Sequence, residues 1–125
     1  MEIKDYQLGL LYMMHLLVSA DGVIDDKERA ALLRVMQYES IPTEALAEFE
    51  AQITKMRERE IYQAGIEMIN KCSDADKIKA FGHLYKMSEA DGTVHVKEVR
   101  LLLYSIRSAK VEFNQVIDHA KSVVY

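Results

Sequence analysis

The chain of 125 residues has little of what interrupts a helix or crosslinks a fold: one proline, five glycines and one cysteine. A single cysteine, Cys72, excludes an internal disulfide and is typical of a reducing compartment. A long hydrophobic run is also missing. The most apolar segment, residues 8–20, contains His15 and Ser19 and is shorter than the ~20 residues that span a membrane. We therefore expect a protein that does not itself span a membrane.

Basic residues are outnumbered, with 16 Lys and Arg against 20 Asp and Glu, which gives a net charge of −4. Nucleic-acid-binding domains normally carry a basic surface, so we expect no nucleic-acid partner. Glu2 and Asp5 stand where a secretory signal peptide would be basic. With half of its residues hydrophobic, the chain is expected to fold as a single domain over residues 1–125 and to be cytoplasmic.

Strong helix formers (Ala, Leu, Met, Glu, Lys, Gln and Arg) make up about half of the chain, and no stretch alternates with a period of two. This composition predicts an all-α fold, a single compact bundle of about seven short helices. Four are expected at about residues 3–19, 26–39, 43–56 and 58–72, with the first central and buried. A fifth begins after a predicted N-cap at Ser73. The last two carry apolar residues from Val99 to Ile106 and from Phe113 to Val123.

The chain contains an internal repeat. Residues 20–28, ADGVIDDKE, recur 70 residues later as ADGTVHVKE at residues 90–98. Each copy follows an apolar helix and precedes an amphipathic one, which predicts two helix–turn–helix halves. The halves are expected at about residues 3–56 and 73–125, with a helix at about 58–72 as the link.

Local helix chemistry explains part of each repeated turn. Glycine suits the left-handed residue that ends a helix, and Asp25 with Glu28 has the spacing of a capping box. Asp21 and Asp91 are not explained in this way, because a carboxylate at the negative end of a helix dipole costs roughly 0.3–1 kcal/mol. We expect each aspartate to have a compensating partner: a loop N–H group, the nearby lysine or a cation.

The repeated motif also resembles the second half of a calcium-binding EF-hand loop. The first half is absent, because Leu17 and Met87 stand where the first ligand should be. One copy alone therefore cannot supply the six to eight oxygens that calcium takes.

Two turns lying side by side would pool their acidic residues. Such a patch would hold a divalent cation, calcium or magnesium, or a basic surface of a partner. If the two turns lie at opposite ends of the bundle, their acidic residues serve only to shape the turns and form no shared site. The candidate metal ligands are Asp21, Asp25, Asp26, Glu28, Glu89, Asp91, His95 and Glu98.

The duplicated motif resembles that of the TerB-like domains, and the resemblance runs from about Leu8 to Val123. It implies a compact bundle of about seven helices in a bacterial, intracellular protein associated with tellurite resistance and the stress response. It also implies membrane-associated and metal-binding protein partners and no established enzymatic activity. The motif positions that carry the suspected metal role are Asp21, Asp25, Glu28, Asp91 and Glu98. His95 and Val96 replace Asp25 and Asp26 in the second copy, which is poorer in oxygen ligands.

The leading hypothesis is therefore a non-enzymatic binding or adaptor module, without catalytic residues. The alternative is a metal-dependent enzyme in which His95 or His83 acts as the base. A third possibility is a homodimer that uses an exposed face of tyrosines and methionines.

Three residues inside the expected helices complete the sequence predictions. His15, on an apolar helix, is expected in the core or an interface, whereas His119 is expected to face solvent. Gly82, beside His83, is expected to allow two helices to approach closely.

Overall fold

A computed structural model describes residues 4–18, 26–88, 100 and 104–123 of the chain. Its helices are α1 (Asp5–Val18), α2 (Asp26–Tyr38), α3 (Thr43–Ile53), α4 (Glu58–Asn70), α5 (Asp74–Ser88) and α7 (Phe113–Ser122). Residues 104–108 are helical as well. These described residues contain no strand, so the predicted all-α fold is confirmed.

The helix boundaries follow the local signals in the sequence. Pro42, in an extended conformation, is the N-cap of α3, and its ring fixes its own φ at −66° immediately before the first turn. The side chain of Ser73 accepts a hydrogen bond from the backbone N–H of Asp76 at 3.2 Å, as predicted for the start of α5. The expected breaks therefore lie where the sequence places them.

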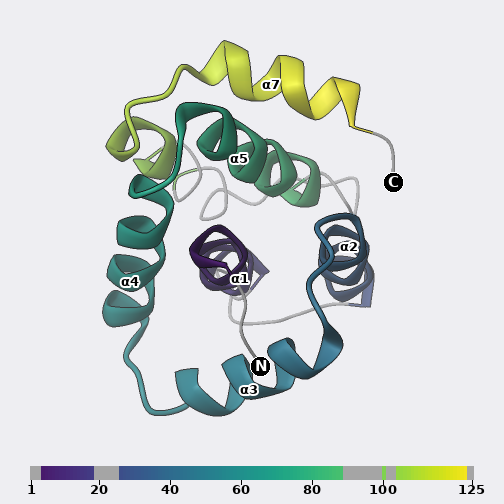
Figure 1. Cartoon of the computed structure of the whole chain (residues 1–125), viewed down its shortest axis with the longest axis vertical. Helices are drawn as coiled ribbons and strands as arrows, with labels where there is room; N and C mark the ends of the chain where they lie inside the picture. Colours follow the sequence, from purple (N-terminus) through teal and green to yellow (C-terminus); the bar gives the residue numbers. More distant parts are fainter. Residues whose placement is uncertain (1–3, 19–25, 89–99, 101–103, 124–125) are drawn as a thin grey trace.

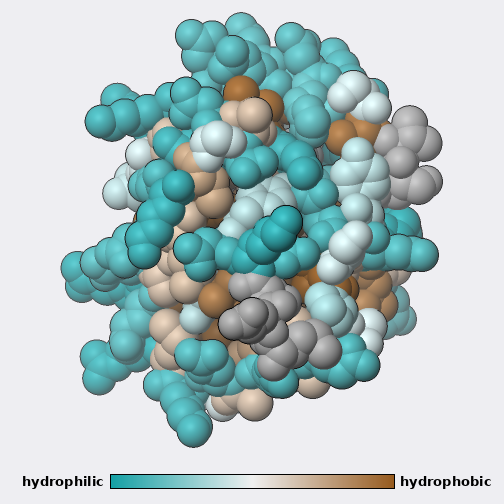
Figure 2. All heavy atoms as spheres, viewed as in Figure 1, coloured by the Kyte–Doolittle hydropathy of each residue, from teal (hydrophilic) through white to brown (hydrophobic). Residues whose placement is uncertain are grey.

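Helix α1 lies at the centre of the bundle, and α2, α3, α4 and α5 surround it (Figure 1). Its predicted burial is confirmed, since residues 10–14, 16 and 17 are almost fully buried. Helix α4 packs closely on α1 at Gly65, where an added Cβ atom would lie 2.8 Å from the Cβ of Tyr12. Hydrophilic side chains cover most of the face seen in Figure 2, with hydrophobic atoms visible between them. Within the described residues, no helix is long and apolar enough to cross a bilayer.

The internal repeat extends to the geometry of the helix ends. Ser40 follows α2 with a φ of 59°, and Lys110, 70 residues later, follows the helical residues 104–108 with a φ of 61°. In the first turn the N–H of Ile41 donates to Met36 O, and in the second the N–H of Val111 donates to Ile106 O. Each turn leads directly into the next helix, α3 or α7.

A tertiary contact is repeated with the same offset. The side chain of Gln7 on α1 donates to the carbonyl of Glu39 at 3.1 Å, and Lys77 on α5 donates to the carbonyl of Ala109 at 3.3 Å. Helices α1 and α5 are thus equivalent elements, as are α3 and α7, which lie on opposite sides of the bundle in Figure 1. The predicted duplication is therefore present in both local and tertiary structure.

Candidate functional site

Two of the eight predicted ligands lie in the described part of the chain, both in the first turn of α2: Asp26 is exposed to solvent, whereas Glu28 is only 3% exposed. The other six lie outside the described residues: Asp21, Asp25, Glu89, Asp91, His95 and Glu98. No group of three or more metal-ligating side chains occurs within the described ranges.

The burial of Glu28 bears on whether these residues suit a metal ion. An ionised carboxylate inside a protein costs several kcal/mol unless hydrogen-bond donors or a cation compensate its charge. Calcium and magnesium prefer carboxylate oxygens, and every predicted ligand except His95 supplies one. The donor set therefore fits a hard divalent cation better than zinc.

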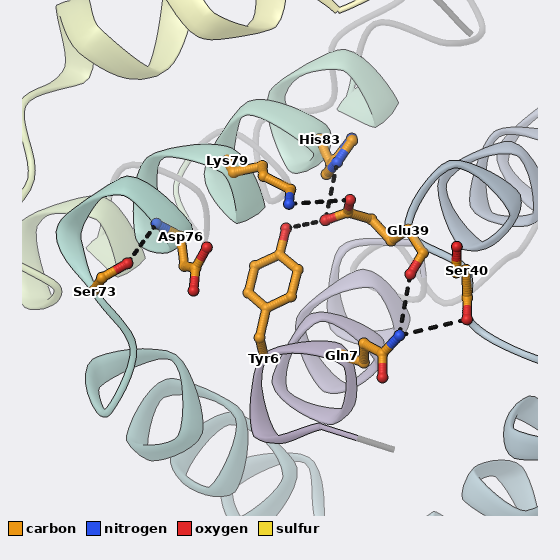
Figure 3. Close-up of polar contacts among 8 residues, drawn as sticks. All are labelled: Tyr6, Gln7, Glu39, Ser40, Ser73, Asp76, Lys79 and His83. Atoms are coloured by element: carbon orange, nitrogen blue, oxygen red, sulfur yellow. Dashed lines mark hydrogen bonds and ion pairs between the residues drawn. The ribbon is translucent and has the colours of Figure 1, made fainter. Parts of the chain in front are cut away.

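A polar cluster joins α1, α5 and the residue that directly follows α2 (Figure 3). Glu39, directly after α2, accepts a hydrogen bond at Oε2 from the Tyr6 hydroxyl on α1. On α5, the Nζ of Lys79 lies 3.3 Å from Glu39 Oε1, and the Nε2 of His83 lies 3.6 Å from Oε2. Lys79 also lies over the ring of Tyr6, 5.1 Å from its centroid. We call Tyr6, Glu39, Lys79 and His83 the Glu39 cluster.

The Glu39 cluster holds its carboxyl group in the ionised state. The Glu39 side chain is 6% exposed, and burial alone would raise its pKa. Polar contacts with His83 and Tyr6 and the attraction of His83 and Lys79 outweigh burial and lower the pKa to about 2. Burial and the hydrogen bond to Glu39 raise the pKa of Tyr6, so its hydroxyl remains a donor.

The cluster serves packing rather than contact with a substrate. Glu39 is nearly buried and His83 is fully buried, so neither side chain presents an atom to a ligand in solution. The enzyme hypothesis therefore receives no support from His83, and His95 lies outside the described residues. Sequence reasoning did not find this cluster, because Tyr6, Glu39 and Lys79 belong to no motif.

The two other histidines differ in how well they were predicted. His15 is half-buried, and its ring lies edge-on to Phe49 with centroids 5.9 Å apart, as expected for a core or interface residue. His119, which was predicted to face solvent, is only partly exposed. Its Nε2 is buried, because the ring packs directly on Gly82 of α5. The close approach predicted at Gly82 is confirmed by the same contact.

An open hollow of about 500 Å³ lies between α1, α2, α3 and the start of α4. Its apolar lining is Ile53, Met56 and Ile61. Its rim carries the Arg29–Glu50 ion pair, in which Nη1 and Oε1 lie 3.8 Å apart and both side chains are about half exposed. The two charges of this pair offset each other, and His15 and Thr54 complete the lining.

Comparison with known proteins supplies the remaining information. A family model described as tellurite resistance protein TerB matches residues 7–118, nearly the whole chain. Searches of curated proteins and of solved structures gave no match. The matched range includes both Asp-Gly motifs and three of the four residues of the Glu39 cluster: Glu39, Lys79 and His83.

Proposed function

Because the chain belongs to the TerB family, we propose that it is a non-enzymatic binding module that holds a divalent cation, calcium or magnesium, between its two Asp-Gly turns. The proposed ligands are carboxylates from both copies of the motif, with His95 as the one nitrogen donor. Neither copy alone supplies enough oxygens, so the cation would join the two halves of the chain.

The observation that carries this proposal is the position of Glu28. It is the last acidic residue of the first motif and lies in the first turn of α2, where its carboxylate is buried. Its neighbours Asp26, Lys27 and Arg29 are exposed, as is usual for charged side chains. Glu28 therefore lies on the buried side of α2, where its carboxylate is shielded from solvent and would attract a cation more strongly than an exposed carboxylate.

The Glu39 cluster supports the proposal from the other end of α2. Glu39 fixes that end against α1 and α5, and these two helices lead into the first and the second Asp-Gly turn. A ligand set drawn from separate segments binds more tightly when its supports are rigid, since less conformational freedom is lost on binding. The cluster thus supplies rigidity, and the turns supply the ligands.

A melting series tests the proposal, with calcium, magnesium, manganese and zinc added in turn to the purified protein. A cation at 100 times its Kd stabilises the folded state by about 2.7 kcal/mol, which raises the Tm by several degrees. We expect the shift with calcium or magnesium, and we expect Asp21→Asn combined with Asp91→Asn to reduce it without loss of helical content.

The matched control removes two charges elsewhere. Glu44 and Glu48 are exposed on α3, so Glu44→Gln combined with Glu48→Gln should leave the shift unchanged. No shift in the parent protein, or an equal shift in the Asp21 and Asp91 double variant, would contradict the proposal.

We further propose that the loaded module acts as an adaptor for a protein partner, which in this family would be membrane-associated. A role in tellurite resistance or the stress response and a cytoplasmic location belong to the same proposal. The family membership supports this role. The module would act by presenting a charged surface whose sign and shape change when the cation binds.

A further inference from the structure

Helix α7 is held on α5 through a contact that involves a titratable side chain. The two helices lie along each other (Figure 1). At their contact a Cβ atom on Gly82 would lie 3.0 Å from the Cδ2 atom of His119. The imidazole therefore occupies the space that a side chain at position 82 would fill.

In the first half of the chain, the position equivalent to His119 holds a phenylalanine, which carries no titratable group. With the 70-residue offset, Gly82 corresponds to Tyr12 and His119 corresponds to Phe49. Tyr12 and Phe49 form an edge-to-face pair with ring centroids 4.9 Å apart, and both are 4% exposed. Phe49 thus joins α3 to α1, and His119 takes its place in joining α7 to α5.

The contact favours the neutral imidazole. The Nε2 of His119 is buried, and no described residue makes a hydrogen bond to it. A proton there would bury a charged N–H group without an acceptor. Burial lowers the pKa of His119, His83 and Lys79 on α5 lower it further, and Glu39 acts in the opposite direction. Glu39 is already engaged by Tyr6 and Lys79.

The other charged groups that α5 and α7 place near the contact do not supply an acceptor for a proton on Nε2 of His119. Lys86 on α5 donates to the carbonyls of Ala120 and Val123 at the end of α7, which makes it a second cation on the same side. Asp118 and Lys121 lie on α7 itself, next to His119 in sequence and two residues away. A proton on His119 therefore meets mainly positive charge.

We propose that protonation of His119 releases α7 from α5 in mildly acidic conditions, while α1, α2 and α5 remain assembled. A histidine whose pKa is lowered in the docked state stabilises docking above its ordinary pKa of 6.5, and this contribution is lost as the pH falls below that value. The Glu39 cluster does not open over this range, because its carboxyl group has a pKa of about 2.

Hydrogen exchange of the full-length protein at pH 7.5 and pH 5.0 tests this inference, after correction for intrinsic exchange rates. The quantity compared is the opening equilibrium constant of α7 divided by that of α1. This ratio can rise by at most about tenfold for each pH unit below 6.5. We expect it to be more than roughly threefold higher at pH 5.0 than at pH 7.5. His119→Phe, which restores the residue of the first half, should abolish the increase. His15→Phe, which alters another half-buried histidine, should retain it.

Two results would overturn the inference. One is equal protection of α7 at both pH values in the parent protein, and the other is an undiminished increase in His119→Phe. An NMR titration of the His119 ring needs no variant, and an apparent pKa of 6.5 or above would also overturn it. The experiment requires no metal ion, so its outcome is independent of the proposed cation site.

Discussion

The hydroxyl of Tyr6, near the start of α1, donates a hydrogen bond to Oε2 of Glu39, which lies 33 residues further along and just beyond α2. This bond forms in a nearly buried site, and Lys79 approaches the other oxygen of the same carboxylate. The side chain of Glu39 is therefore contacted by both α1 and α5. Its removal should affect the whole bundle rather than α2 alone.

Glu39→Gln is expected to lower the free energy of unfolding by about 2–3 kcal/mol at pH 7, because Lys79 and Tyr6 lose a charged acceptor inside the protein. Urea unfolding followed by circular dichroism measures the change. Glu48→Gln, on the exposed face of α3, serves as the control and should change the free energy by less than about 0.5 kcal/mol. Equal effects of the two substitutions would show that the Glu39 cluster does not support the fold.

The pKa of the Glu39 carboxyl group predicts how the free energy of unfolding changes in acid. This pKa is lowered from 4.5 to about 2, so the stabilisation is complete above pH 4.5 and disappears as the pH falls toward 2. The shift corresponds to a contribution on the order of 3 kcal/mol. Urea unfolding between pH 6 and pH 2.5 should show this loss in the parent protein and a flatter profile in Glu39→Gln. Parallel profiles would mean that other groups govern acid unfolding.

Gly65→Ala tests the close packing of α4 on α1. In an exposed helix this change would stabilise the protein by up to about 1 kcal/mol. Here the new Cβ atom would lie 2.8 Å from the Cβ of Tyr12 and 3.1 Å from the Sδ of Met13. We expect a loss of about 1–3 kcal/mol, because α1 and α4 must move apart. A lower Tm in Gly65→Ala would show that the close packing dominates, and a higher Tm would show that helix propensity does.

Ser73→Ala tests the start of α5. The Ser73 hydroxyl accepts a hydrogen bond from the backbone N–H of Asp76, and its loss should cost about 1 kcal/mol. Ser73→Asp should retain most of the stability, because aspartate caps helices equally well. If both variants lose the same amount of stability, the cap does not explain the boundary of α5.

Much of the fold was predictable because helices leave local signals. Helices were expected at about residues 3–19, 26–39, 43–56 and 58–72 and after an N-cap at Ser73, and α1 to α5 lie there. The repeat at residues 20–28 and 90–98 predicted a duplication, which the matching turns at Ser40 and Lys110 extend.

The polar contacts were not predictable in this way. Tyr6 is on α1, Glu39 directly follows α2 and Lys79 is on α5, so tertiary packing alone brings them together, and no periodic pattern marks them. His119 was expected to face solvent because it lies near the C-terminus, although the glycine at position 82 indicated that another helix packs closely there. For the candidate site, the sequence placed Glu28 in the first turn of α2, but its burial depends on the packing of the whole bundle.

A calorimetric titration of the purified protein with calcium, repeated with magnesium, tests the cation proposal most directly. Glu28→Gln keeps the shape of the buried side chain and removes its charge, whereas Glu44→Gln changes an exposed acid on α3. We predict saturable binding by the parent protein and by Glu44→Gln, with an affinity at least roughly tenfold weaker in Glu28→Gln. Absence of binding heat with either cation in the parent protein, or equal affinities in all three proteins, would contradict the proposed function.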